Sequence, residues 1–360
     1  MNYIGSKYSL LPFLDECITS VAGDCHAAPV LCDIFAGTGA VGRHFKQKGY
    51  RIIANDLQYY SYVLNRHYIG NHKELTFDGL TDELARAATS SLFDDRYTAV
   101  CNLLNGLEPC EGFIFNNYCK GNRSDDEEYR LYFSNENGAK CDAIRLKIEE
   151  WKSAGRISDD EYFFLLTTLL EGIDKVANTA SVYGAFLKKL KASALKPLTM
   201  TPAKLYCNDI DHRVFNTDAN RLIQSISPDI LYLDPPYNHR QYSSNYHVLE
   251  TIARYDNPPL RGKTGMRDNR GQQSLYCSRA KVKSAFAELI NAARARFIFL
   301  SYNNEGLMTP GDIREIMSAR GRYGCFTREY SRFKADKESA SRHIKADSTT
   351  EFLHFVEVTR

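Results

Sequence analysis

The sequence lacks any apolar run long enough to cross a membrane, and its net charge is only +2 over 360 residues. A membrane-spanning helix needs about 18 or more predominantly apolar residues. The first ten residues, MNYIGSKYSL, contain no apolar core of signal-peptide length. We therefore expect a protein that stays in the cytoplasm and has no membrane partner.

Paired cysteines are also lacking, although the chain has ten cysteines. No CxxC occurs, and the spacing of Cys110 and Cys119 matches no zinc-ligand pattern. We expect reduced, scattered thiols and no metal site, as is usual for a cytoplasmic protein.

Disorder and sequence repetition are not apparent either. Hydrophobic residues make up 43% of the chain and charged residues 25%, which is ordinary for a folded globular protein. A length of 360 residues suggests two or three domains, because one domain usually spans roughly 100–200 residues. We expect a core with an insertion.

The first and last thirds of the chain have the pattern of a parallel α/β sheet. PVLCDIF, AGTGAVG, a mixed stretch to Lys48 and then RIIAND read as strand, glycine turn, helix and strand. Later apolar runs at 230–234, 296–302 and 351–358 are typical of strands that helices cover on both faces.

The middle of the chain has helical periodicity. Ile144, Ile148 and Trp151 share a helix face that should end at Gly155, and Ser158 opens a capping box for the next helix. We expect core segments at 1–107 and 201–360 and a mainly helical insertion at 108–200. Residues 116–138 are polar and rich in turn formers, which predicts a surface loop.

A glycine turn follows the first strand, in the segment Asp33-Ile-Phe-Ala-Gly-Thr-Gly39. Such a turn either is purely structural or lets a ligand approach the backbone at a helix N-terminus. Asp56, at the end of the next strand, favours the ligand because an acid there can accept both hydroxyls of a ribose. The spacing to Gly42 still allows a dinucleotide, which the rest of the chain argues against.

A second motif, Asp234-Pro-Pro-Tyr237, follows the apolar run ILYL. Consecutive prolines fix the backbone and hold a carboxylate and a carbonyl at the carboxyl edge of the sheet, where ligands of α/β proteins bind. A plain turn is the alternative, but an acid before the prolines and an aromatic residue after them favour a site.

The two motifs together resemble the α-group (Dam-like, FokI-type) of S-adenosylmethionine-dependent, adenine-specific N6 DNA methyltransferases. Asn2-Tyr-Ile-Gly-Ser-Lys7 is similar to the family's N-terminal cofactor motif, and the motif order is that of the α-group. The resemblance implies a Rossmann-like methyltransferase sheet with a helical target-recognition domain in the insertion. FokI-type enzymes join two methyltransferases, whereas this chain has one glycine loop and one DPPY.

The resemblance also implies roles for individual residues. The S-adenosylmethionine site would comprise Tyr3, Lys7, Asp33, Phe35, Gly37, Gly39, Asp56, Asp234 and, on the cofactor adenine, Asp209 or its neighbour Asp211. The catalytic tetrapeptide would comprise Asp234, Pro235, Pro236 and Tyr237.

The tetrapeptide suits amino-group chemistry, because the adenine nitrogen is a poor nucleophile that needs hydrogen-bond acceptors. The Asp234 carboxylate and the Pro235 carbonyl would accept from the NH₂, and Tyr237 would stack on the base after it leaves the duplex. The proton would leave through Asp234 or water.

Double-stranded DNA is the expected partner, and local basic runs support it. Residues 261–283 carry seven basic residues against one acid, and further runs lie at 188–196 and 328–345. Solvated surface is the alternative for each run. The expected DNA contacts are Asn116, Asn117, Tyr118, Tyr183, Lys188, Lys189, Arg240, Lys263, Arg267 and Arg270.

Two other functions fit less well. An RNA or protein-amide methyltransferase usually carries Asn in place of Asp234, and a silent DNA-binding relative should have lost reactive side chains that this chain retains. We expect a site-specific modification enzyme, a monomer or weak dimer, whose partner could be a cognate restriction endonuclease.

Overall fold

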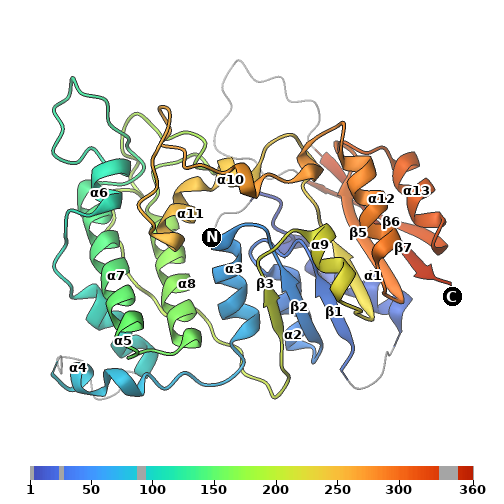
Figure 1. Cartoon of the computed structure of the whole chain (residues 1–360), viewed down its shortest axis with the longest axis horizontal. Helices are drawn as coiled ribbons and strands as arrows, with labels where there is room; N and C mark the ends of the chain where they lie inside the picture. Colours follow the sequence, from blue (N-terminus) through green and yellow to red (C-terminus); the bar gives the residue numbers. More distant parts are fainter. Residues whose placement is uncertain (1–3, 24–27, 87–94, 332–347, 360) are drawn as a thin grey trace. The chain divides into compact units, whose positions relative to one another are not determined.

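The computed structural model describes residues 4–23, 28–86, 95–331 and 348–359. They divide into two compact units, here called the sheet unit and the helical unit (Figure 1). The sheet unit contains Gly5–Asn65, Asn208–Tyr242 and Gln272–Arg360. The helical unit contains Met1–Ile4, Arg66–Cys207 and Ser243–Gly271.

The sheet unit is built on one mixed sheet whose strands follow the order β3-β2-β1-β4-β5-β7-β6. Strands β1 to β5 are parallel, whereas β7 runs antiparallel to both β5 and β6. The strands are β1 (Val30–Asp33), β2 (Arg51–Asn55), β3 (Arg213–Phe215), β4 (Ile230–Leu233), β5 (Phe297–Asn303), β6 (Gly321–Ser331) and β7 (Ser348–Val358).

The predicted strand–helix–strand unit is confirmed, because β1 pairs in parallel with β2 and α2 (Ala40–Gln47) connects them. The prediction of an all-parallel sheet is wrong at 351–358, since β7 is antiparallel. Two strands were missed. β3 has only three residues, and β6 mixes polar and apolar residues as an edge strand does.

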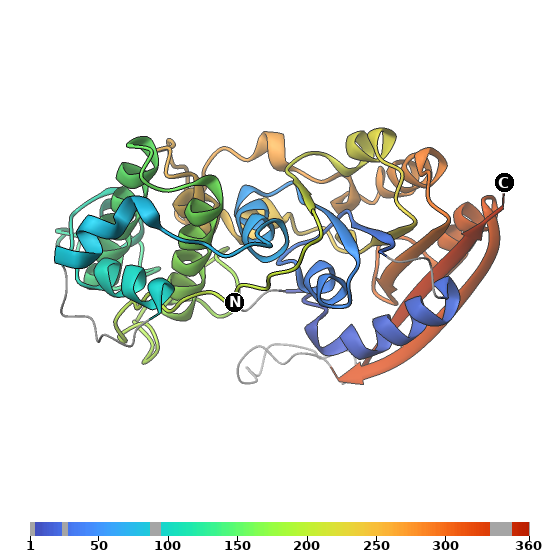
Figure 2. The ribbon, with the colours of Figure 1, turned by 90° about the horizontal axis from the view of Figure 1, so that it is seen from below.

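Helices cover both faces of the sheet (Figure 2). One face packs against α9 (Ala219–Leu222), α12 (Val282–Ala292) and α13 (Pro310–Ser318) around a buried apolar cluster that includes Leu231 and Phe286. The other face is covered by α1 (Leu11–Ala22) and α2. The remaining helices of this unit are α3 (Tyr59–Asn65), η1 (Tyr8–Leu10), η4 (Ile223–Ser225) and η6 (Leu275–Cys277). Two short helices cross the boundary between the units, α10 (Tyr242–Asn245) and η5 (Arg270–Gln272).

The helical unit is organised by two antiparallel neighbours, α7 (Asn135–Ser153) and α8 (Asp159–Lys175). The predicted helix end is confirmed, because Gly155 follows α7 with a φ of +66°. The predicted capping box is also confirmed, since Ser158 Oγ accepts from Glu161 N and Glu161 Oε2 accepts from Ser158 N. The other helices are η2 (Arg66–Gly70), η3 (Asp78–Leu80), α4 (Thr81–Arg86), α5 (Arg96–Asn105), α6 (Phe113–Tyr118) and α11 (His247–Arg254).

The helical unit is not a single insertion at 108–200. Its longest segment begins at Arg66, and it also takes Ser243–Gly271 from the part of the chain that we expected to belong to the core. The physical reason is α11, whose buried side chains pack against α8. Among the described residues, no helix has the length and apolar character required to span a membrane.

Candidate active site

The carboxyl ends of β1 and β4 define a topological switch point in the sheet unit. β1 pairs with β2 on one side and with β4 on the other, although about 200 residues separate β1 from β4 in the chain. Asp33 is the last residue of β1, and Asp234 directly follows β4. The two predicted motifs therefore meet at the edge where open α/β sheets bind ligands.

The glycine loop after β1 is held by side chains from the next strand and helix. Gly37 and Gly39 have φ values of +52° and +77°, which residues with a Cβ rarely adopt. Asp56 Oδ2 accepts from the Gly37 N–H at 2.9 Å, and Asn65 Nδ2 donates to the Gly37 carbonyl at 2.9 Å. These contacts fix the loop at the N-terminus of α2.

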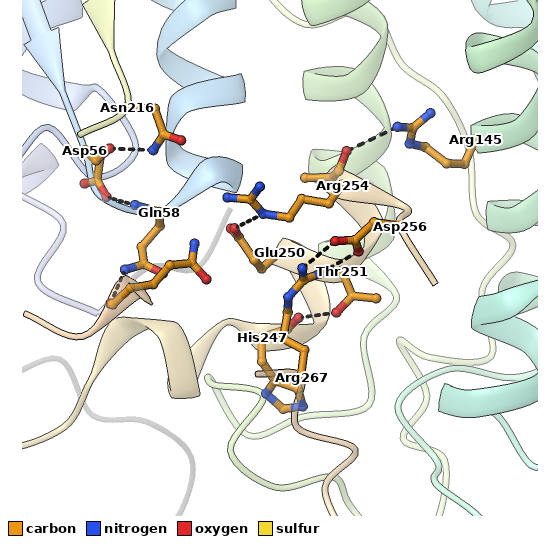
Figure 3. A network of polar contacts seen from close by, with 12 residues as sticks. Asp56, Gln58, Arg145, Asn216, His247, Glu250, Thr251, Arg254, Asp256 and Arg267 are labelled. Carbon is orange, nitrogen blue, oxygen red and sulfur yellow. Dashed lines mark hydrogen bonds and ion pairs between the residues drawn. The ribbon is translucent and has the colours of Figure 1, made fainter. Parts of the chain in front are cut away.

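Asp56 also connects the loop to the neighbouring strand ends (Figure 3). Its Oδ1 accepts from the backbone N–H of Gln58 at 2.8 Å, and its carbonyl accepts from Asn216 Nδ2 at 2.7 Å. Each carboxylate oxygen of Asp56 can accept more than one hydrogen bond. Since its side chain is half-buried, the carboxylate can also accept hydrogen bonds from a ligand.

Asp33 is buried at the end of β1, and its two carboxylate oxygens differ in their hydrogen bonding. Oδ2 accepts from the Gly42 N–H at 3.3 Å, whereas Oδ1 is buried without a hydrogen-bond partner among the described residues. Burial, followed by the nearby charge of Asp234, raises the pKa of Asp33 to about 8. A buried carboxylate oxygen of this kind suits a cationic donor of a ligand.

Asp234 is paired with a buried lysine. Lys7 Nζ lies 2.9 Å from Asp234 Oδ1 and 3.4 Å from Glu351 Oε1, and only 18% of the Asp234 side chain is exposed. Burial raises the pKa of Asp234 to about 6, although the charge of Lys7 opposes this shift. Burial would lower the pKa of Lys7, but its two carboxylate neighbours raise it well above its ordinary value. Lys7 is therefore a stable cation beside the tetrapeptide.

The rest of the tetrapeptide is held against the sheet unit. Pro235 is buried, and the backbone carbonyl of Tyr237 accepts from the Leu307 N–H at 3.1 Å. The Tyr237 ring is half-buried at the border of the apolar cluster, and burial raises the pKa of its hydroxyl. Tyr237 is thus an anchored aromatic residue whose hydroxyl stays protonated at neutral pH.

Comparison with known proteins identifies the family. A family model described as D12 class N6 adenine-specific DNA methyltransferase matches residues 3–316. The chain belongs to this family. It is 52% identical to Type II methyltransferase M.NlaIII of Neisseria lactamica, with 100% of both chains covered.

Two further relatives show how the chain compares in length. Type II methyltransferase M.CviAII of Paramecium bursaria Chlorella virus 1 is 33% identical over 99% of this chain and 98% of its own. Type II methyltransferase M.FokI of Planomicrobium okeanokoites is 37% identical over 95% of this chain but 51% of its own. The FokI-type resemblance is confirmed, and the chain spans about half of that relative.

The membership settles the reaction and the fold. The protein is an N6-adenine DNA methyltransferase with a Rossmann-like α/β sheet, and S-adenosylmethionine is its methyl donor. The site fits this cofactor, because Asp33 Oδ1 has no hydrogen-bond partner among the described residues and suits a cationic donor such as an ammonium group. Phe35 is half-buried next to Asp33 and packs edge-on against Tyr276, while Tyr3 lies outside the described residues.

Asp209 lies in the wrong place for the cofactor adenine. It precedes β3, whose residues Arg213 and Phe215 pair with Ile53 and Asn55 of β2. Asp209 and Asp211 are therefore at the amino end of β3, opposite the edge that carries Asp33 and Asp56. The sequence did not indicate β3, because three residues are too few to form a recognisable apolar run. Asn216, which directly follows β3, is the polar residue at the carboxyl end of this strand, and its Nδ2 donates to the Asp56 carbonyl.

Two predicted DNA contacts of the methyltransferase are buried within the helical unit. Tyr118 and Tyr183 are both 0% exposed. The Tyr118 hydroxyl donates to the Gly265 carbonyl at 2.9 Å, and the Tyr183 hydroxyl donates to Asp174 Oδ1 at 2.9 Å. Their rings pack with Tyr132. This burial does not fit the expectation that they contact DNA.

The neighbouring amides have backbone partners. Asn116 is exposed, and its Nδ2 donates to the carbonyls of Glu111 and Gly112. Asn117 is half-buried and donates to the Phe113 carbonyl at 2.9 Å. Both amides stabilise α6 and its entry, so the structure gives them a local role in the absence of DNA.

The basic run at 261–283 is partly neutralised by acids from elsewhere in the chain. Arg267 is 8% exposed and forms a two-pronged ion pair with Asp256 at 2.9 and 2.7 Å (Figure 3). In the sheet unit, Lys283 pairs with Asp312 at 2.8 Å. A count of charges along the sequence could not reveal these partners.

The other predicted cations are on the surface. Arg270 pairs with Asp268 next to it, while Lys188, Lys189, Lys263 and Arg240 are exposed. Arg328 extends over the ring of Phe13, and the rest of the third basic run, from Arg332 to Lys345, lies outside the described residues. Lys188 and Lys189 form no ion pair within the part of the chain that the structure describes.

Glu351, the second carboxylate that pairs with Lys7, was not predicted from the sequence. Glu351 opens the apolar part of β7 and is 1% exposed. Ser301 Oγ, on β5, donates to Glu351 Oε1 at 2.5 Å. The available signal was a lone carboxylate at the start of an otherwise apolar run.

Proposed function

We propose that this methyltransferase modifies one adenine within a specific duplex sequence and uses the residues at the β1 and β4 ends for the transfer. The observation that supports this assignment is the meeting of Asp33 and Asp234 at the switch point of the sheet. One end then serves the cofactor and the other serves the adenine amine.

S-adenosylmethionine supplies a methyl group activated by a sulfonium centre. Asp33 Oδ1 would accept from its ammonium, and this cation would lower the pKa of Asp33 from its raised value. Asp56 would accept from the ribose hydroxyls while it keeps Gly37 in place. We propose Asn216, rather than Asp209, for the polar edge of the cofactor adenine because Asn216 adjoins Asp56.

Lys7 takes a different role from the one expected. Two carboxylates already surround its ammonium, so we propose that it acts mainly on Asp234 and that one remaining N–H can serve the cofactor carboxylate. Gly37 and Gly39 let the cofactor approach the loop backbone, and Phe35 provides apolar surface beside it.

Asp234 would hold the amino group of the adenine. With a pKa of about 6, its carboxylate is ionised at neutral pH and can accept an N–H hydrogen bond together with the Pro235 carbonyl. The two acceptors favour a tetrahedral nitrogen with an available lone pair, and Asp234 can take the proton. Tyr237 would stack on the base, which must leave the helix to be reached.

Sequence choice is proposed for the helical unit, where two buried amides hold an exposed basic loop. Asn178 is 0% exposed, donates to the carbonyls of Leu131 and Leu187, and accepts from the Lys191 N–H. Asn137 is 2% exposed and in the same way binds the backbone of Ala194, Lys196 and Leu198.

Residues 178–198 form no helix or strand, and these amide contacts hold their backbone instead. They hold Lys188 and Lys189 on a fixed backbone, which reduces the ordering cost when the loop meets DNA. We propose that this loop contacts the duplex, with Lys263 and Arg240 as further phosphate contacts. Asn116 and Asn117 remain candidates for base contacts if DNA displaces their backbone partners.

The biological setting is proposed from the relatives. M.NlaIII, M.FokI and M.CviAII are named type II methyltransferases, and a relative from Lactococcus lactis is named modification methylase LlaI. We propose that this enzyme protects cytoplasmic DNA from a cognate restriction endonuclease and acts as a monomer or weak dimer.

Single-molecule sequencing tests the proposal. Plasmid DNA without adenine methylation is incubated with the full chain and S-adenosylmethionine and is then read for modified bases. We expect N6-methyladenine at one recurring sequence and none with Asp234→Ala. Methylation of cytosine, or of adenines without any common sequence, would contradict the proposed function.

A further inference from the structure

A buried acid from the last strand completes the environment of Asp234. Glu351 lies on β7, opposite Asn303 and diagonal to Ser301 on β5. It is 1% exposed, and its contacts are Lys7 Nζ at 3.4 Å and Ser301 Oγ at 2.5 Å. The family model ends at residue 316, so the match does not extend to Glu351.

We infer that Glu351, held by Ser301, is a positioning residue that acts on Asp234 through Lys7 and sets the charge balance of the transfer site. The inference rests on the proposed role of Asp234 as the acceptor of the adenine amine. Glu351 itself does not have to touch the substrate.

The geometry gives Glu351 two effects. It gives the lysine ammonium a second carboxylate partner, so that the position of Lys7 is set by two ion pairs rather than one. Its negative charge also offsets part of the lysine charge felt by Asp234. Asp234 is thus kept more basic than it would be beside Lys7 alone, which favours uptake of a proton from the amine.

A purely structural role makes a different prediction. Removal of one partner of a buried ion pair destabilises the fold, because the charge of the other partner is left uncompensated. A structural Glu351 would affect folding or the amount of active enzyme, whereas a positioning Glu351 must also change the pH dependence of transfer.

The groups around Asp234 make the direction of the change definite. Lys7 comes from the segment before α1, Asp33 from β1, Tyr232 from β4, Tyr237 from the tetrapeptide and Glu351 from β7. Only the charge of Glu351 is removed in Glu351→Gln, and the amide oxygen can still accept from Ser301. The pKa of Asp234 should then fall, because Lys7 acts on it without compensation.

The experiment measures single-turnover methyl transfer to plasmid DNA, with saturating S-adenosylmethionine, between pH 5 and 9. These conditions are chosen to span the pKa of about 6 that Asp234 has in the structure. For Glu351→Gln we expect the acid limb to move down by at least about 0.5 pH unit and the plateau rate to fall on the order of tenfold. Ser301→Ala, which removes the hydrogen bond that holds the Glu351 carboxylate beside Lys7, should move the limb in the same direction by less.

Glu357→Gln is the matched control, since Glu357 lies on the same strand but pairs with the exposed Arg322. It should leave the pH profile unchanged. The inference is overturned if the acid limbs of Glu351→Gln and Ser301→Ala coincide with that of the parent. If Glu351→Gln does not fold, Ser301→Ala alone decides. Activity of Asp234→Ala would instead refute the proposed function, so the two failures are distinguishable.

Discussion

Lys7 Nζ lies 2.9 Å from Asp234 Oδ1, which brings the N-terminal motif and the catalytic tetrapeptide into direct contact. The resemblance of the sequence to its family implies that this lysine belongs to the S-adenosylmethionine site. In the structure its positive charge lowers the pKa of Asp234 against the larger effect of burial. The pair therefore links the N-terminal motif to the protonation state of Asp234.

Lys7→Met should move the acid limb of methyl transfer upward. Without the cation, burial and Glu351 act unopposed on Asp234, so its pKa rises from about 6 and the carboxylate is lost at a higher pH. We expect a shift of about one pH unit, which lowers the rate at pH 7 by about twofold and the rate at pH 6 by more. Lys48→Met, which removes an exposed lysine paired with Asp15, is the control and should keep the parent profile. A Lys7→Met profile equal to that of the parent would contradict the role given to this pair.

Asp234→Ala should abolish transfer while DNA binding persists. The change removes an acceptor of the amine hydrogens and the group that takes the proton, but no phosphate contact. We expect the rate to fall by at least about 10³-fold, as when chemistry depends on one positioned group. Gel-shift and single-turnover assays on the same duplex measure the two properties. A mutant that keeps a tenth of the parent rate would remove Asp234 from the mechanism.

Asp33→Asn should stabilise the free protein and weaken its binding of S-adenosylmethionine. The pKa of Asp33 is raised from 3.8 to about 8, so the folded protein binds its proton more tightly than the unfolded chain does. The cost of charging this carboxylate therefore reduces stability progressively as the pH rises from about 4 to about 8. Asparagine has no charge, and the melting temperature at pH 8 should rise by several degrees.

The same variant has a clear control and a clear contrary result. At pH 4 the parent Asp33 is mostly protonated, so the two melting temperatures should converge there. Calorimetry should show at least about tenfold weaker binding of the cofactor, because the ammonium loses a charged acceptor. Tight binding by Asp33→Asn would mean that Oδ1 does not meet the cofactor.

Much of the sheet unit could be predicted because local signals agreed with the fold. The apolar runs of β1, β2, β4 and β5 are fully buried or nearly so, and the two motifs sit at strand ends. β3 was not predicted, because three residues do not form a recognisable apolar run. The expected contact with the cofactor adenine was assigned to Asp209, which precedes this strand. The direction of β7 was predicted wrongly, because an apolar run does not indicate whether its strand runs parallel or antiparallel to the neighbouring strand.

The pairing of polar side chains could not be predicted, whether the partners are about ten or several hundred residues apart in the chain. Arg267 was expected to contact DNA, but it forms an ion pair with Asp256. Tyr183 was also expected to contact DNA, but its hydroxyl donates to Asp174 Oδ1. Glu351 is 344 residues from Lys7 by their numbers, and nothing in the sequence joins them. Burial and ion pairing depend on tertiary contacts, which residue types alone do not specify.

Asp56→Ala should weaken cofactor binding far more than it slows saturated transfer. A ribose contact is made equally in the ground and transition states, so its loss raises the dissociation constant and leaves the plateau rate nearly unchanged. The loss of the Gly37 contact adds to the effect, because the loop is then less well ordered. Asp209→Ala, at the other edge of the sheet, is the matched control and should bind normally. Equal affinities for Asp56→Ala and the parent, measured by calorimetry, would place the cofactor elsewhere.

Replacing both Lys188 and Lys189 with Gln should weaken DNA binding in a salt-dependent way, whereas Arg267→Gln should act through stability. The two lysines are exposed without ion pairs among the described residues, so their loss removes phosphate contacts and should reduce the slope of log K against log salt by about 2. Arg267 is buried and pairs with Asp256, whose side chain is 47% exposed, so loss of this ion pair should cost about 1 kcal/mol or less. Its salt slope should match the parent. Melting curves and binding isotherms at several salt concentrations separate the two effects. If Arg267→Gln flattens the slope while the double lysine variant leaves it unchanged, the DNA-contacting surface is the 261–271 segment and not the loop at 178–198.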